Sequence, residues 1–192
     1  MADLFQYSTY LVRRKIFKIF GGAFHIYGPD KQLVFYSKMK AFKLKEDIRL
    51  YTGTDMQSEV FSVKARQIID FSATYDVVDS AAGQKIGALK RKGFKSMLRD
   101  EWAIMDASDR EIGAIVEDSL LLAIIRRFLS NLIPQTYHVT MNGALVCAIK
   151  QNFNPFVLKM TVDFTPDIQH VLDKRLGLAG AILLCAIEGR QR

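Results

Sequence analysis

Basic side chains gathered in two segments are the residues of this sequence best suited to bind another molecule. Residues 1–50 hold ten Lys and Arg against four Asp and Glu, a net charge of +6. Residues 85–99 hold six Lys and Arg and no acid, again +6. Because the 192-residue chain carries only +7 in total, the remaining residues sum to −5. Concentrated positive charge attracts anionic membranes, nucleic acid or acidic proteins, and an ordinary solvated surface is the other explanation.

The second segment combines consecutive bases with an aromatic ring, in Lys90-Arg91-Lys92-Gly93-Phe94-Lys95. Near a charged bilayer each basic residue contributes on the order of 1 kcal/mol, and the same groups suit nucleic-acid phosphates. A run of three bases also occurs near the amino terminus. The candidate lipid-contacting residues are Lys90, Arg91, Lys92, Lys95, Arg13, Arg14 and Lys15.

Catalytic and nucleotide-binding motifs do not occur: there is no Gly-x-Ser-x-Gly, Walker A, Gly-x-Gly-x-x-Gly, His-Glu-x-x-His or Cys-x-x-Cys. His25 and His138 occupy the same position of a repeated strand pattern, which predicts outward side chains and no metal pair. Cys147 and Cys185 are too few for a disulfide framework or a multi-cysteine zinc site. We therefore expect no catalytic residue, metal or cofactor, and an enzyme with an unrecognised constellation is the least favoured alternative.

Repeated hairpins are the elements that must position these bases. Four segments begin with the same pattern, which is an aromatic residue, one other residue and a β-branched residue. Each segment is followed by turn residues and then by a second apolar run. The turns lie at residues 28–30, 79–83, 106–109 and 142–143, and a fifth hairpin is expected across residues 47–63. Asn-Gly at 142–143 is the strongest two-residue hairpin signal. Many short strands with close turns indicate a sandwich or a barrel.

The sequence predicts two helices. Residues 118–134 predict an amphipathic helix, with Asp118 or Ser119 at its start and Pro134 at its end. Residues 176–187 carry no charge, and as a helix they would span about 18 Å, short of the roughly 30 Å of a bilayer core. A helix that is apolar all round must be buried all round. This predicts a terminal helix threaded through a barrel whose wall the hairpins supply.

This order of elements resembles the tubby C-terminal-like fold, specifically the LURP-one-related and phospholipid scramblase group. The stretches that carry the resemblance are residues 10–15, 42–47, 86–93 and 173–188. The resemblance implies a mainly β fold, a closed antiparallel barrel of about twelve strands around the buried C-terminal helix, formed by residues 1–192 as a single domain. It also implies a non-enzymatic role near membranes, because tubby domains bind phosphoinositides and scramblases are linked to calcium and lipid movement.

The sequence departs from scramblases in several features. It lacks their Pro-rich amino-terminal region and their Cys-rich palmitoylation cluster. Asp163, Asp167 and Asp173 precede the terminal helix without the spacing of a calcium-binding loop, so we expect no calcium site. No phosphoinositide-binding motif of tubby domains matches residue by residue, so no binding residue is carried over from them.

The function expected from these observations is binding of anionic phospholipid headgroups by a non-enzymatic, membrane-associated domain, with phospholipid scrambling as a related activity. The alternative is a cytosolic scaffold or regulatory domain that binds another protein. Nucleic acid is a less favoured partner, and the oligomeric state is left open. The sequence shows no amino-terminal targeting pattern and no Asn-x-Ser/Thr site, which predicts a cytoplasmic location with peripheral attachment to membranes.

Overall fold

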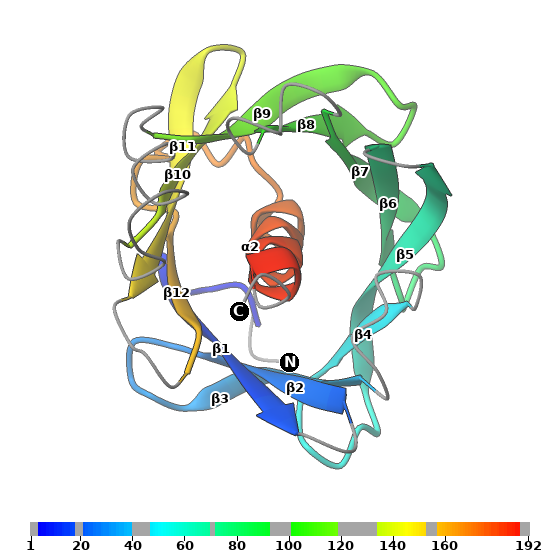
Figure 1. The fold of residues 1–192 in the computed structure, drawn as a ribbon, viewed down its shortest axis with the longest axis vertical. Helices are drawn as coiled ribbons and strands as arrows, with labels where there is room; N and C mark the ends of the chain where they lie inside the picture. The colour runs from blue at the N-terminus through cyan, green and yellow to red at the C-terminus, as the bar shows by residue number, and fades with distance from the viewer. Residues whose placement is uncertain are drawn as a thin grey trace.

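The computed structural model describes residues 4–17, 21–39, 47–69, 72–92, 101–118, 134–152 and 157–188. These residues form twelve strands and one helix, drawn in Figure 1. The strands are β1 (Thr9–Phe17), β2 (Gly21–Tyr27), β3 (Leu33–Met39), β4 (Ile48–Tyr51), β5 (Glu59–Ile69), β6 (Ser72–Asp79), β7 (Lys85–Arg91), β8 (Glu101–Asp106), β9 (Glu111–Glu117), β10 (Thr136–Met141), β11 (Ala144–Asn152) and β12 (Lys159–Asp163). The helix is α2 (Lys174–Glu188).

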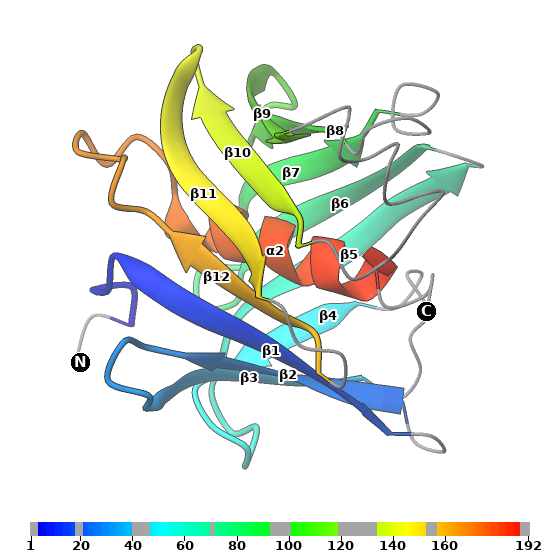
Figure 2. The same cartoon turned by 60° about the vertical axis from the view of Figure 1, so that its left-hand side comes forward.

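The strands close into an antiparallel barrel in which sequence neighbours pair all the way round. The ring closes between β1 and β12, where Tyr10 lies opposite Val162. Closure removes the unpaired strand edges that an open sheet would expose. Figures 1 and 2 show α2 inside this ring. The predicted mainly β barrel around a C-terminal helix is confirmed.

The five predicted hairpins are present as β2–β3, β4–β5, β6–β7, β8–β9 and β10–β11. At the tip of β10–β11, Asn142 and Gly143 have φ angles of 50° and 83°. Two residues with positive φ give the turn whose twist matches paired strands. In β8–β9 the carboxylate of Asp106 accepts hydrogen bonds from the backbone N–H groups of Ser108 and Arg110. Local turn chemistry therefore accounts for these hairpins.

The helix α2 is enclosed by the barrel, as its uniformly apolar sequence predicts. Its apolar side chains from Leu176 to Ala186 are at most 3% exposed. Glycines let the wall approach the helix closely: a Cβ on Gly177 would lie 2.5 Å from the Phe164 ring, and one on Gly180 would lie 2.6 Å from Ile115 Cδ1. Small residues in α2 are therefore required by the narrow interior.

Polar groups hold both ends of α2. At the start, the Asp173 carboxylate accepts a hydrogen bond from the backbone N–H of Arg175 at 2.9 Å, the geometry of an N-cap. Lys174 Nζ donates to the backbone carbonyls of Phe5 and Tyr7 at 2.6 and 2.9 Å. At the other end, Arg14 Nη1 donates to the Cys185 carbonyl at 2.6 Å. The last carbonyls of a helix have no partner within it and favour a cation.

The predicted amphipathic helix between Asp118 and Pro134 falls on residues 119–133, outside the described residues. In the described part of the chain, no helix combines the length and the apolarity needed to cross a bilayer.

Candidate functional site

The two basic segments of the sequence lie on opposite sides of the barrel. Arg13, Arg14 and Lys15 belong to β1, whereas Lys90 and Arg91 belong to β7. In the closed strand order these two strands are six steps apart in either direction, as Figure 1 shows. Their outward side chains therefore cannot form one continuous patch on the wall.

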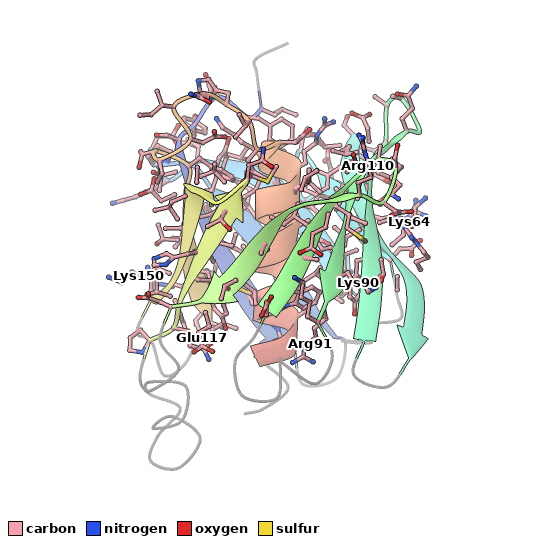
Figure 3. All side chains as sticks on the ribbon, turned by 90° about the horizontal axis from the view of Figure 1, so that it is seen from above. Lys64, Lys90, Arg91, Arg110, Glu117 and Lys150 are labelled. Carbon is pink, nitrogen blue, oxygen red and sulfur yellow. The ribbon has the colours of Figure 1, made fainter. Side chains whose placement is uncertain are left out.

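On β7, consecutive bases point to different faces. Lys90 is exposed, whereas Arg91 is half-buried and shares its row with Trp102 and, one strand further, Ile115, both buried. Because successive strand residues alternate between faces, Arg91 is directed inward. In Figure 3 it lies nearer than Lys90 to the barrel end at which α2 finishes. The assignment of Arg91 to a surface shared with Lys90 is thus corrected.

The third base of this segment is neutralised within the protein. Lys92 Nζ lies 2.7 Å from Glu111 Oε1 and 3.2 Å from Glu101 Oε1. The hydrogen bond to Glu111 raises the pKa of Lys92, assisted by Glu101. Lys95, the fourth candidate, lies outside the described residues. Lys90 is the candidate on this wall that remains directed to solvent.

On β1, the three consecutive bases divide in the same way. Arg14 is 2% exposed and follows the inward residues Tyr10 and Val12, which are fully buried. The sequence-based assignment of Arg14 to a lipid surface is therefore wrong, because its guanidinium is directed into the barrel and bound to the end of α2. Arg13 and Lys15 occupy the outward positions of this strand.

Strand pairing brings further bases beside those of β1. Arg13 lies directly opposite Lys159 of β12. Lys15 and Lys38 flank Ala23 in one row across β1, β2 and β3. Lys150 of β11 lies opposite Thr161, two residues beyond Lys159 and therefore diagonal to it. We define the basic face as Arg13, Lys15, Lys38, Lys150 and Lys159.

Lys38, Lys150 and Lys159 were missed from the sequence because only the barrel register places them beside β1. The sequence around each of these lysines does indicate an outward position, but it does not indicate which other strands lie beside it. Lys38 continues the outward alternation after Tyr36, and Lys150 follows the inward Ile149. Period-two patterning could have placed them on the outer side of strands, but only the order of strands around the ring shows that they lie together.

The charge of the basic face is not balanced by any acid in the described part of the chain. None of its five bases forms an ion pair with another described residue. Arg13 and Lys159 are like charges on directly opposite positions, an arrangement that destabilises a sheet. An external anion would relieve this repulsion.

The wall formed by β5 to β9 is arranged differently. Asp109 Oδ1 lies 2.6 Å from Lys85 Nζ and 2.8 Å from Arg66 Nη2. Arg66 also contacts Asp76, which lies 3.5 Å from Lys85 Nζ. We define Arg66, Asp76, Lys85 and Asp109 as the paired face. Its two bases and two acids neutralise one another.

A histidine and two tyrosines adjoin the basic face. His25 lies between Arg13 on β1 and Tyr36 on β3. Its ring stacks on Tyr27 at a centroid distance of 6.2 Å and meets Tyr36 edge-on at 5.1 Å. Burial lowers the pKa of His25, and the charges of Lys15 and Arg13 lower it further. Tyrosine suits a membrane–water interface, because its ring is apolar and its hydroxyl is polar.

The described residues contain no group of three or more His, Cys, Asp or Glu side chains placed to hold a metal ion. Burial raises the pKa of Cys147 far above its ordinary value, so this thiol does not supply a thiolate nucleophile. The basic face is therefore the feature of the described surface that is best suited to a ligand, and the ligand it suits is an anion.

Comparison with known proteins identifies the family of this chain. The model of the family described as LURP-one-related matches residues 33–185, most of the sequence. The chain belongs to the LURP-one-related family. A search of curated proteins finds no match. An X-ray structure of a protein from Arabidopsis thaliana is similar with 14% identity and a TM-score of 0.48, over 97% of this chain and 93% of that one.

The segment of this LURP-one-related protein that matches the family model contains only part of the candidate site. Lys38, Lys150 and Lys159 lie within residues 33–185, whereas Arg13, Lys15 and His25 precede them. The resemblance to LURP-one-related proteins is confirmed, and the wider grouping with scramblases and tubby domains stays a prediction.

Proposed function

We propose that this LURP-one-related protein is a non-enzymatic, membrane-associated domain that binds anionic phospholipid headgroups through the basic face. The supporting observation is that five outward bases on neighbouring strands form no ion pair among the described residues. At on the order of 1 kcal/mol for each base near a charged bilayer, such a set can hold a domain at a membrane surface. A role in moving lipids between leaflets rests on the family resemblance alone.

The shape of the site supports a surface ligand more than a small enclosed one. The five bases lie on the outside of a closed wall, and the adjoining tyrosines Tyr27 and Tyr36 are partly exposed. A bilayer presents many headgroups in one plane, so several bases can be satisfied at once. Each exposed base gains little alone, and their number determines the affinity.

Binding to vesicles tests this proposal. We expect the protein to sediment with vesicles of phosphatidylcholine containing 30 mol% phosphatidylglycerol, and not with phosphatidylcholine alone. Because exposed charges are screened by salt, binding should weaken between 50 and 300 mM NaCl. Equal binding to both types of vesicle, or binding that does not respond to salt, would contradict the proposal.

A pair of matched variants locates the binding surface. Lys15→Ala/Lys38→Ala removes two bases from the basic face. Lys85→Ala/Lys90→Ala removes two bases from β7, which lies six strands from β1 in the closed ring. Both variants lose the same charge. At about 1 kcal/mol per base, the first should bind phosphatidylglycerol vesicles about 30-fold more weakly, and the second less than about threefold more weakly. Equal losses would contradict the basic face, and a larger loss in the second variant would assign binding to Lys90.

One observation favours the alternative, a scaffold or regulatory domain that binds another protein. The loop before α2 exposes Ile168 and Val171, which are 85% and 51% accessible. The loop is held in shape because the Asp167 carboxylate accepts the backbone N–H groups of Val171 and Leu172 at 2.9 and 3.0 Å. A purified partner whose binding is lost in Ile168→Ser/Val171→Ser, and kept in Lys15→Ala/Lys38→Ala, would support this function.

A further inference from the structure

His25 occupies a position on the basic face that makes its charge sensitive to a bound anion. It lies directly opposite Arg13 on β1 and directly opposite Tyr36 on β3. Lys15 lies two residues from Arg13 on the same outward side of β1. Cross-strand neighbours of this kind have Cβ atoms about 5 Å apart when opposite and 7–8 Å apart when diagonal. Two permanent cations are therefore within direct electrostatic reach of the imidazole.

Each strand that packs against His25 contributes cations, and the tyrosines around it come from β2 and β3. β1 contributes Arg13 and Lys15, β3 contributes Tyr36 and Lys38, and β2 itself contributes Tyr27. Lys159 of β12 lies beyond Arg13, and Tyr51 of β4 lies beyond Tyr36. None of these positions holds a carboxylate. Nδ1 of His25 is buried and has no hydrogen-bond partner among the described residues.

These surroundings favour the neutral imidazole in the free protein. Burial lowers the pKa of His25 first, and Lys15 and Arg13 lower it next. The last two causes are electrostatic, so an anion bound beside Lys15 and Arg13 would offset them. Protonation of His25 and occupancy of the basic face by an anion then assist each other, because a coupling between two binding events acts equally in both directions.

We propose that binding of an anionic headgroup to the basic face is coupled to uptake of a proton by His25, so that the protein holds anionic membranes more tightly as the pH falls. This inference rests on the proposed function. It adds a regulator to the same surface, namely the proton concentration near the membrane. A rise of about one unit in the pKa of one group corresponds to an affinity change of up to about tenfold.

The test is vesicle binding between pH 5.5 and 7.5 at constant ionic strength. Phosphatidylglycerol is the chosen lipid because its phosphodiester stays singly charged throughout this range, so that only the protein titrates. The wild-type protein should bind about three- to tenfold more tightly at pH 5.5 than at pH 7.5. His25→Gln should lose this dependence and keep the weaker affinity. His25→Lys, with a permanent charge, should keep the stronger affinity at every pH.

His138→Gln is the matched control, because His138 also lies on the outer side of a strand but faces Asp118 at 3.6 Å. It should retain the wild-type dependence. If His25→Gln keeps the full dependence, or if His138→Gln loses it, the inference is overturned. If the wild-type protein fails to bind these vesicles at every pH, the proposed function itself is overturned, and the inference with it.

A second measurement does not depend on how the variants fold. The titration of the His25 ring can be followed by NMR in the wild-type protein, free and with nanodiscs. The midpoint should lie below the ordinary value of 6.5 in the free protein and rise with nanodiscs that contain phosphatidylglycerol. It should stay unchanged with phosphatidylcholine nanodiscs. An unchanged midpoint in the bound state would overturn the inference.

Discussion

The basic face and the paired face lie on different walls of one barrel and treat similar side chains in different ways. On the paired face, Lys85 and Arg66 each contact Asp109 within 3 Å. On the basic face, Arg13 and Lys159 are placed opposite one another with no acid between them. The comparison teaches that the net charge of +7 is a poor guide to function. The informative quantity is the positive charge that the protein does not neutralise itself.

Two neighbouring bases of β1 also differ in whether the protein binds their charge, and substituting them should give the largest difference in stability. Arg14→Met should lower the free energy of unfolding by about 3 kcal/mol, because the end of α2 loses a charged hydrogen-bond donor. Arg13→Met, one residue away and directed outward, should change it by less than about 0.5 kcal/mol. Urea denaturation measures both. Similar losses in the two variants would show that the inward and outward bases of β1 do not have separate roles.

Acid should destabilise the paired face by a mechanism that the basic face lacks. Arg66 and then Lys85 lower the pKa of Asp109 from 3.8 to about 2. A lowered folded-state pKa contributes stability above pH 4 that is lost as the pH falls towards 2. Asp109→Asn, which also tolerates the local φ of 64°, should be less stable at pH 7 and lose less stability across this interval. Thermal unfolding at pH 7, 4, 3 and 2 checks the profile, and a slope equal to that of the wild type would refute it.

The smallest effects should differ in sign between the two faces. Lys85→Gln removes a base from the paired face and should lower the free energy of unfolding by about 0.5 kcal/mol. Lys159→Gln removes one of two opposed cations from the basic face and should raise it by a few tenths of a kcal/mol, roughly the worth of a cross-strand pair. Denaturation at low ionic strength resolves the two. A loss of stability in Lys159→Gln would mean that this base has a structural partner.

The parts of this fold that could be predicted from the sequence are those determined by interactions between residues close together in the chain. Asn142-Gly143 and Asp106 specify turns through backbone geometry that few residues adopt. The helix from Lys174 could be expected inside the barrel because it has no polar side on which to face water. In both cases the physical cause lies within a dozen residues of its effect.

The parts of the site that sequence missed depend on contacts between distant strands. Lys159 lies beside Arg13 only because the ring closes between β12 and β1. Arg14 could have been assigned to the interior from its alternation with Tyr10 and Val12, but the neighbouring Leu11 weakens that pattern. The contact of Arg14 with Cys185 spans most of the chain, and no local signal encodes it.

The central claim is that the basic face, and not the opposite wall, meets the membrane. The most direct measurement is the loss of NMR signal caused by a spin-labelled lipid in nanodiscs containing phosphatidylglycerol. The account predicts that the backbone signals of Lys15 and Lys38 broaden strongly, and that those of Lys85 and Lys90 on β7 do not. Broadening centred on Lys85 and Lys90, or no broadening at either wall in a protein that binds the discs, would contradict it.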